Sequence, residues 1–229
     1  MNRKLVLLCA IFSMALFMGG CANRAMEGQH SGFLNDYEGL DDNPQFEGAM
    51  VRVMPGADFT KYQNIMVAPV KIISNIPEGE VSPAQTKLFS QISQYLTDGY
   101  IRNLQQGGSY NVVDSAGPDT MIFEVAISAV EVHFDDMQWY QFTPVTLGLT
   151  VVARATYVDQ AVRILGEARV TDSESGEVLL RAMGLQEGEE VGTEADELVF
   201  ADVKPALDIW LERSSKRFEE MKKGLIKAE

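Results

Sequence analysis

One group of side chains in the sequence could bind a metal ion or transfer protons. His133, Asp135 and Asp136 are close neighbours, and imidazole and carboxylate groups serve as metal ligands and as acid–base catalysts. We predict, however, that they lie at the end of an extended strand, where successive side chains point to opposite faces. The three groups would then not converge on one atom. We therefore interpret them as a polar strand end that enters a turn.

Other kinds of catalytic chemistry have little support in the residue pattern. A serine nucleophile would have to recruit His133, because the other histidine, His30, lies in a polar stretch near the amino terminus, and no G-x-S-x-G motif occurs. The pair Gly107-Gly108 lacks the later glycine and lysine of a phosphate-binding loop. Both cysteines lie within the first 21 residues, which disfavours a zinc site in the rest of the chain. We predict a protein that is not an enzyme and that holds no cofactor or metal.

A run of carboxylates follows later in the chain, between Gln186 and Glu197. Clustered carboxylates can bind calcium, but this run lacks the alternating D-x-[DN]-x-[DN]-G order that brings oxygen ligands around one ion. We interpret it as a solvated loop or an acidic edge.

Three aromatic residues mark the candidate partner surface. Trp139, Tyr140 and Phe142 fall in a segment that we expect to be a loop, and exposed aromatic side chains often anchor binding partners. The alternative is that they cover the edge of the core or pack on the segment at 31–40, and the sequence favours this alternative. No catalytic residue is assigned to the segment under either interpretation.

The charge balance excludes one class of partner. The chain has 19 Lys and Arg residues against 33 Asp and Glu residues, for a net charge of −14. Nucleic-acid binding requires a clustered positive surface, so we expect no nucleic-acid partner. Binding to anionic lipid headgroups through basic residues is disfavoured for the same reason.

The amino terminus has the features of a bacterial lipoprotein signal. Arg3 precedes the apolar run from Leu5 to Met18, which is shorter than the roughly 20 residues of a spanning helix. Small residues then precede Cys21, an arrangement that resembles the lipobox, with cleavage between Gly20 and Cys21. Acyl chains such as palmitate on Cys21 would attach the protein to a membrane. Ala22 replaces the Asp of an inner-membrane retention signal, which predicts the outer membrane and, we expect, a periplasm-facing domain.

These features divide the chain into four parts. We predict a signal peptide at 1–20, a lipidated tether at 21–30, an ordered arm carrying the SGFL motif at 31–56, and a single α/β domain at 57–229. The hydrophobic spacing in residues 33–40 indicates one helical turn or an arm laid onto the domain.

Two separated motifs resemble those of a known family. They are SGFLNDYEGL at 31–40, followed by PGADF at 55–59 and YQNIMVAPV at 62–70, and the late hairpin VTDSESGEVL at 170–179, in which Ser175 stands where Thr is usual. The sequence thereby resembles the bacterial lipoproteins with domain of unknown function 3313. This resemblance implies a lipoprotein, and it implies no particular activity.

Two long amphipathic helices are expected. Ser82 before Pro83 is typical of a helix start, and Gly107-Gly108 of a helix end. Asp202 is the expected cap of the last helix, with Pro205 in its first turn. Apolar residues recur at helical spacing in both: Leu88, Phe89, Ile92, Tyr95, Leu96, Tyr100, Ile101 and Leu104 in the first, and Val203, Leu207, Trp210, Leu211, Phe218, Met221 and Leu225 in the second.

The remaining elements are expected to form one sheet. Strands are predicted at 65–73, 110–113 and 121–134, and as a hairpin of 161–171 and 177–185 around the turn at 172–176. Residues 143–157 fit either a strand or a small-residue helix. The fold class is an α/β (α+β) sandwich, in which a mixed, mainly antiparallel sheet packs against two long helices. The order of elements also resembles envelope domains of the TolB amino-terminal type.

Three functions fit this organisation. The first is an outer-membrane-anchored periplasmic lipoprotein that binds or organises envelope components without enzymatic activity, with an envelope protein as partner. The second is a carrier of a lipid or another apolar ligand, which would need an apolar pocket between sheet and helices. The third is a hydrolase with two carboxylates about 5–9.5 Å apart.

Overall fold

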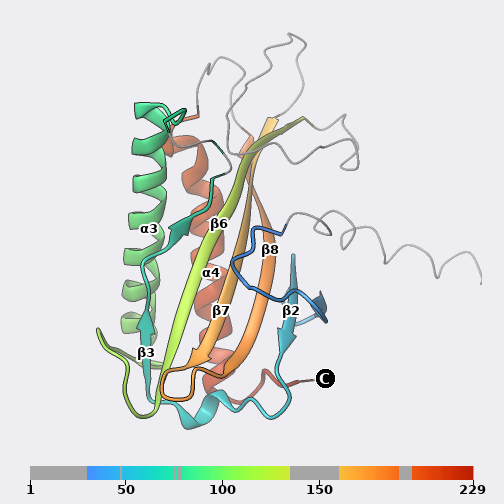
Figure 1. The fold of residues 1–229 in the computed structure, drawn as a ribbon, viewed down its shortest axis with the longest axis vertical. Coiled ribbons are helices and arrows are strands. Elements are labelled where there is room, and N and C mark those ends of the chain that lie inside the picture. Colours follow the sequence, from blue (N-terminus) through green and yellow to red (C-terminus); the bar gives the residue numbers. More distant parts are fainter. Residues whose placement is uncertain are drawn as a thin grey trace, which may run out of the picture.

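The computed structural model describes residues 30–46, 48–74, 76, 79–134, 160–190 and 198–228. These residues form one eight-stranded sheet with two long helices packed on one of its faces (Figure 1). The sheet is mixed and mostly antiparallel, and it is not closed into a barrel. The predicted fold class is therefore confirmed.

The sheet is built around three long strands. They are β6 (Thr120–Phe134), β7 (Gln160–Asp172) and β8 (Val178–Glu190), which pair antiparallel in sequence order. Five short strands complete the sheet: β1 (Asp41–Asp42), β2 (Ala49–Val53), β3 (Asn64–Val67), β4 (Lys71–Ile72) and β5 (Asn111–Val112). The strand order is β1-β2-β8-β7-β6-β3-β5, and β4 pairs with β6 outside this order. Among the described strands, the parallel pairings are those of β3 with β5 and β6, and of β4 with β6.

Helix α3 (Pro83–Gly107) begins and ends where the sequence predicted. The Ser82 hydroxyl accepts a hydrogen bond from the amide of Gln85 at 3.1 Å, and the Gln85 side chain accepts one from the amide of Ser82 at 2.8 Å. At the other end, Gly108 adopts a left-handed conformation with φ of 64°, which glycine takes without steric cost. The side chains that α3 buries include Ile92, Leu96 and Tyr100.

Helix α4 (Phe200–Lys222) begins earlier than predicted. The cap position is Val199, and the carboxylate of Asp202 accepts a hydrogen bond from the Val199 amide at 2.9 Å from inside the first turn. The prediction that Asp202 is the cap is therefore wrong, and Pro205 lies beyond the first turn. Leu225 was predicted on the buried stripe, but it follows the end of the helix and is 57% exposed.

The predicted strand at 65–73 is divided into β3 and β4. Proline has no amide hydrogen for a sheet ladder, and Pro69 lies in the break. Helix α3 supplies the missing partners, because Thr97 Oγ1 accepts a hydrogen bond from the Val70 amide and the Ser93 hydroxyl donates one to the Val70 carbonyl.

The hairpin of β7 and β8 is confirmed, but β8 is longer than predicted. It continues to Glu190, so the first part of the carboxylate run belongs to a strand and not to a loop. Gln186 within it is only 8% exposed. The segment 143–157, for which strand and helix were both open, lies outside the described residues.

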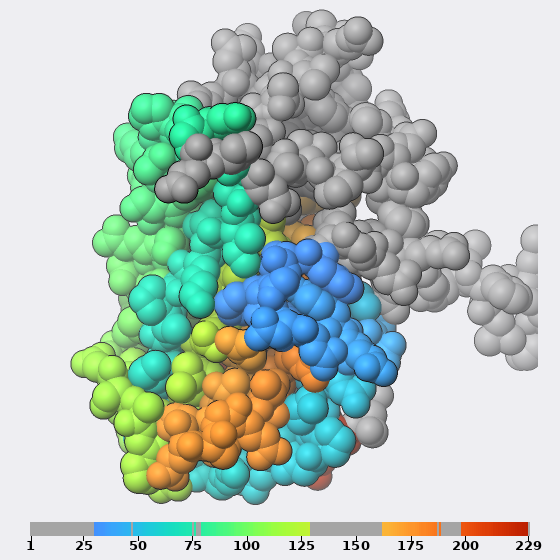
Figure 2. Space-filling view, in the orientation of Figure 1, coloured from blue at the N-terminus to red at the C-terminus, as the bar shows by residue number. Residues whose placement is uncertain are grey.

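Residues 31–40, which we call the SGFL segment, lie on the sheet face opposite the helices. Figure 2 shows this part of the chain, in blue, lying across the strands of the β7–β8 hairpin. Leu34 and Leu40 are buried there against Leu165 and Met183. The segment consists of turns without a helix.

Candidate functional site

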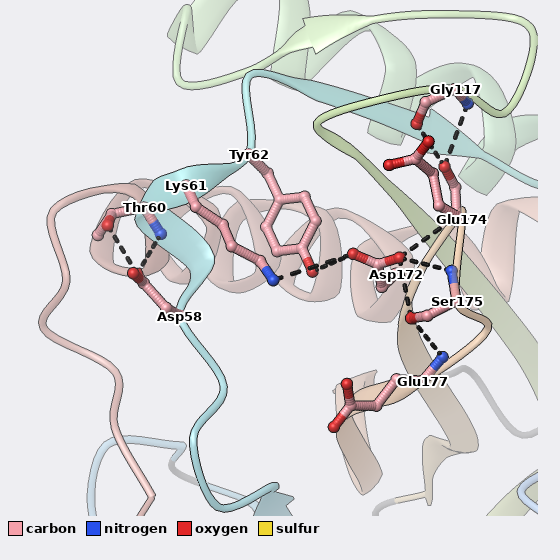
Figure 3. Close-up of polar contacts among 10 residues, drawn as sticks. Asp58, Thr60, Lys61, Tyr62, Gly117, Asp172, Glu174, Ser175 and Glu177 are labelled. Carbon is pink, nitrogen blue, oxygen red and sulfur yellow. Dashed lines mark hydrogen bonds and ion pairs between the residues drawn. The ribbon is translucent and has the colours of Figure 1, made fainter.

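The late hairpin motif forms a polar cluster at the end of the sheet (Figure 3). Asp172 Oδ1 accepts hydrogen bonds from the amides of Ser175 and Glu174 at 2.8 and 3.0 Å, which closes the turn. Asp172 Oδ2 accepts a bond of 2.7 Å from the hydroxyl of Tyr62, which follows the short 3-10 helix η1 (Phe59–Lys61). The motif thus joins two parts of the chain that are far apart in sequence.

The electrostatics of this cluster are those of a structural contact. The amide of Ser175 and then the hydroxyl of Tyr62 lower the pKa of Asp172 to about 2. Burial, followed by the bond to Asp172, raises the pKa of Tyr62. Asp172 therefore stays ionised and Tyr62 stays protonated near neutral pH, and neither group is poised to exchange a proton there.

A second cluster fixes the SGFL segment to the sheet. Glu167 on β7 is fully buried. Its carboxylate accepts hydrogen bonds from the Ser31 amide at 3.0 Å and from the Tyr37 hydroxyl at 2.6 Å. Burial, and then this bond, raise the pKa of Tyr37. A buried carboxylate needs such donors to offset its lost hydration, so Glu167 depends on the segment that covers it.

Arg181 on β8 makes the complementary contact. Its guanidinium donates a 2.5 Å hydrogen bond to the Asp36 carbonyl and forms an ion pair with the Asp36 carboxylate. The amide of Glu38, and then Arg181, lower the pKa of Asp36. One guanidinium nitrogen of Arg181 thus contacts both the backbone and the side chain of Asp36 and holds the SGFL segment in place. Both motif clusters are explained by folding.

An open groove lies between the sheet and α4, with a cavity volume of about 230 Å³. Its floor consists of small residues at facing positions on neighbouring strands: Ala49 opposite Gly184, Gly184 opposite Gly166, and Ala182 opposite Ala168. Protein interiors are normally close-packed. The small side chains on these strands leave room for the ring of Trp210 over Gly166 and for the cavity beside it.

Large side chains form the walls of the groove. The ring of Trp210 on α4 lies against Gly166, where an added Cβ would come within 2.1 Å of it. Phe46 and Phe218 also line the cavity. Bulky residues on the helix therefore face glycine and alanine on the strands, and the space between them is apolar.

The rim of the groove is basic, although the chain is strongly acidic. Arg213, Lys216 and Arg217 project from α4 into the lining, and no Asp or Glu is found among the described lining residues. Arg217 is already paired with Glu220 and lies over the ring of Phe46. For Arg213 and Lys216 the described part of the chain provides no hydrogen-bond acceptor or ion-pair partner.

The site residues predicted from the sequence lie outside the described residues. These are Gly20 and Cys21 at the predicted cleavage and lipidation site, and Trp139, Tyr140 and Phe142 of the candidate partner surface. His133 is in β6, where its backbone pairs with Ala161, and His30 stacks on Tyr37 with 3.8 Å between ring centroids.

Within the described ranges, no three His, Cys, Asp or Glu side chains are grouped so as to hold a metal ion. In the same ranges, no helix combines the length and the apolar character that crossing a bilayer requires.

Sequence reasoning missed the groove. The negative net charge of the chain disfavoured binding to anions, but a net charge does not show that cations gather on one helix. The available signal was the pair of small-residue positions on each predicted hairpin strand, Gly166 and Ala168 on the first and Ala182 and Gly184 on the second. Alternate positions of a strand share a face, so these four residues predict one shallow region.

The fold and the groove define an α+β domain with a small apolar site open to solvent. The chain belongs to the family described as protein of unknown function DUF3313, whose model matches residues 29–214. It is also similar to the uncharacterized lipoprotein YdcL of Escherichia coli K12, with 25% identity over 209 residues that cover 90% of each chain. Its relatives are thus lipoproteins without an assigned role.

Several solved structures of bacterial proteins are similar to this chain at low sequence identity. The PelC dodecamer from Paraburkholderia phytofirmans matches with a TM-score of 0.39 and 10% identity, covering 76% of this chain and 97% of that one. Lipoprotein GNA1162 from Neisseria meningitidis gives a TM-score of 0.34 and 11% identity, with 67% and 96% covered. A minor lipoprotein from Acinetobacter baumannii gives 0.37 and 6%, with 73% and 98% covered.

Proposed function

We propose that this protein is a lipoprotein anchored in the outer membrane through acyl chains on Cys21, with a periplasmic domain that binds a component of the envelope. The proposed location and anchor rest on the amino-terminal sequence, where a short apolar run ends in two glycines and a cysteine. The lipoprotein relative that covers 90% of the chain supports the anchor. Several acyl chains give lasting attachment without a spanning helix.

The groove under α4 is the observation that carries the binding role. It is an apolar concavity with a few polar groups at its rim, which is the usual form of a ligand site. In the motif clusters, in contrast, the carboxylates of Glu167 and Asp172 accept hydrogen bonds from tyrosine hydroxyls of the same chain. We therefore assign the domain a binding function and no catalysis, with an envelope protein as a partner that the domain organises.

The groove also favours the second candidate, a carrier of a lipid or another apolar ligand. Such a role requires a cavity that side chains leave unfilled, and about 230 Å³ is free here. The third candidate, a hydrolase with paired carboxylates, has no support at this site, because the described lining residues include no Asp or Glu.

Membrane fractionation tests the proposed location, and intact-protein mass spectrometry tests the proposed lipid anchor. The wild-type chain should be found in outer-membrane fractions, with a mass that begins at Cys21 and includes acyl groups. Cys21→Ser should abolish the acyl mass and the cleavage, and Cys9→Ser, within the signal, is the matched control that should leave both unchanged. An unlipidated wild-type chain would refute the proposal.

A further inference from the structure

We propose that the groove under α4 binds one acyl chain of an anionic phospholipid, whose headgroup is held by Arg213 and Lys216. This inference deepens the proposed binding function, on which it rests, by naming the ligand class and the residues that recognise it. Three features of the groove lead to it: its shape, its charge and the state of the surrounding backbone.

The shape of the groove fits a flexible apolar chain. Ala49, Gly184 and Gly166 form a row of small residues across three adjacent strands, β2, β8 and β7. Trp210 closes the groove on the side of α4, where its ring lies against Gly166. The volume of about 230 Å³ is below the roughly 300–1,000 Å³ of sites that enclose a whole drug-sized ligand. It suits part of a longer molecule, with the remainder outside.

The charge of the rim fits a single anionic group. Arg213 lies at the mouth, with its Nη1 atom 3.5 Å from the position of an added Cβ on Gly48. Lys216 lies one turn further along the exposed side of α4. Arg217 is held by Glu220, which leaves Arg213 and Lys216 for a ligand. Two cations without a partner among the described residues lie beside an apolar cavity, in a chain with a net charge of −14. They are complementary to an amphipathic anion.

The surrounding backbone favours an acyl chain over a peptide. The strands that form the floor are already hydrogen-bonded to one another, β2 to β8 and β8 to β7. A peptide in the groove would bury its own amide and carbonyl groups without strand partners, which is unfavourable. A hydrocarbon chain has no such groups to satisfy. The geometry therefore points to a lipid as the occupant.

Native mass spectrometry of the full lipidated chain, extracted from membranes in a neutral detergent, tests this proposal. We expect one bound phospholipid per chain with an anionic headgroup. A denaturing spectrum of the same sample should lose this mass but retain the covalent acyl groups on Cys21, which separates ligand from anchor. When phosphatidylglycerol and phosphatidylcholine are added in equal amounts, phosphatidylglycerol should be bound preferentially.

Paired variants assign the binding to the groove. Arg213→Gln with Lys216→Gln should raise the Kd for phosphatidylglycerol, measured by titration, at least about tenfold, the usual effect of losing hydrogen bonds from charged groups. The matched control is Lys204→Gln with Lys223→Gln, two exposed cations of the same helical region whose partners lie outside the groove. Ala182→Leu fills the floor and should reduce the binding of both lipids, and circular dichroism checks its folding.

Several outcomes would overturn the proposal. They are the absence of a noncovalent lipid in the wild type, equal binding of the two headgroups, equal losses in the rim variant and its control, or a bound peptide in place of lipid. Displacement of the lipid by excess inorganic phosphate alone would assign the rim to free phosphate and would also overturn it. None of these results alters the test of the anchor at Cys21, so the two proposals can fail independently.

Discussion

The hydrogen bond between Tyr62 and Asp172 makes a quantitative prediction about stability. Tyr62→Phe keeps the ring, which is 1% exposed, and removes only the hydroxyl that donates to the carboxylate at 2.7 Å. A hydrogen bond to a charged group contributes about 1.5–3 kcal/mol. Because the Asp172 side chain is 18% exposed, water replaces part of this bond, and we expect a loss of about 1–2 kcal/mol at pH 7.

The loss should depend on pH. The pKa of Asp172 is lowered from 3.8 to about 2 in the folded protein, so its contribution to stability is complete above the unfolded value. This contribution decreases as the pH falls from about 5 toward 2. Tyr62 is the second-largest cause of the shift, and Asp172 is still mostly ionised at pH 3. The difference between Tyr62→Phe and the wild type should therefore shrink by about 0.2–0.5 kcal/mol between pH 7 and pH 3.

Urea unfolding at both pH values, followed by circular dichroism, measures the effect. Asp172→Asn is the companion variant, and the double variant completes a cycle whose coupling energy should be about 1 kcal/mol at pH 7. An equal loss for Tyr62→Phe at both pH values would refute the charge-dependent part of the reasoning. A coupling energy near zero would show that the two side chains do not stabilise each other.

Three further changes have expected outcomes. Tyr37→Phe removes a donor from the buried carboxylate of Glu167 and should cost about 1–3 kcal/mol, with faster hydrogen exchange in the SGFL segment than elsewhere. Gly166→Ala should destabilise the protein by about 1–3 kcal/mol, measured by thermal unfolding, because the new methyl would overlap the ring of Trp210; stability equal to that of the wild type would contradict the close contact. Ser82→Ala removes the cap of α3 and should cost about 1 kcal/mol in urea unfolding, whereas Ser82→Asp should retain most of the stability.

The parts of the fold that local signals determine were predictable from the sequence. Ser82 and Gly108 mark the ends of α3 because a side-chain acceptor and a left-handed residue satisfy groups that any helix leaves free. The turn at 172–176 was predictable because Gly176, with φ of 71°, follows a carboxylate that caps the turn. In these cases the residues that decide the structure are neighbours in the chain.

Features decided by distant residues were not predictable in the same way. The division at Pro69 is stabilised by Thr97 and Ser93 of α3, and no local pattern indicates that these hydroxyls lie opposite the break. From the sequence of its strand, Glu167 would be taken for a surface carboxylate. It is instead hydrogen-bonded by the Tyr37 hydroxyl and the Ser31 amide, which lie 130 and 136 positions away in the chain. A buried polar residue becomes predictable only when the register of its partner is known.

The groove shows why net charge is a poor guide to ligand charge. A surface rich in carboxylates repels anions at long range, but that repulsion is screened within about 8 Å at physiological ionic strength. Binding then depends on the few groups in direct contact, which here are cations beside an apolar floor. Arg213 and Lys216 are three residues apart on α4, so they lie on neighbouring positions of one helical face. The relevant sequence pattern is therefore the combination of helical cations with small residues at alternate strand positions, because together they place charge next to empty apolar volume.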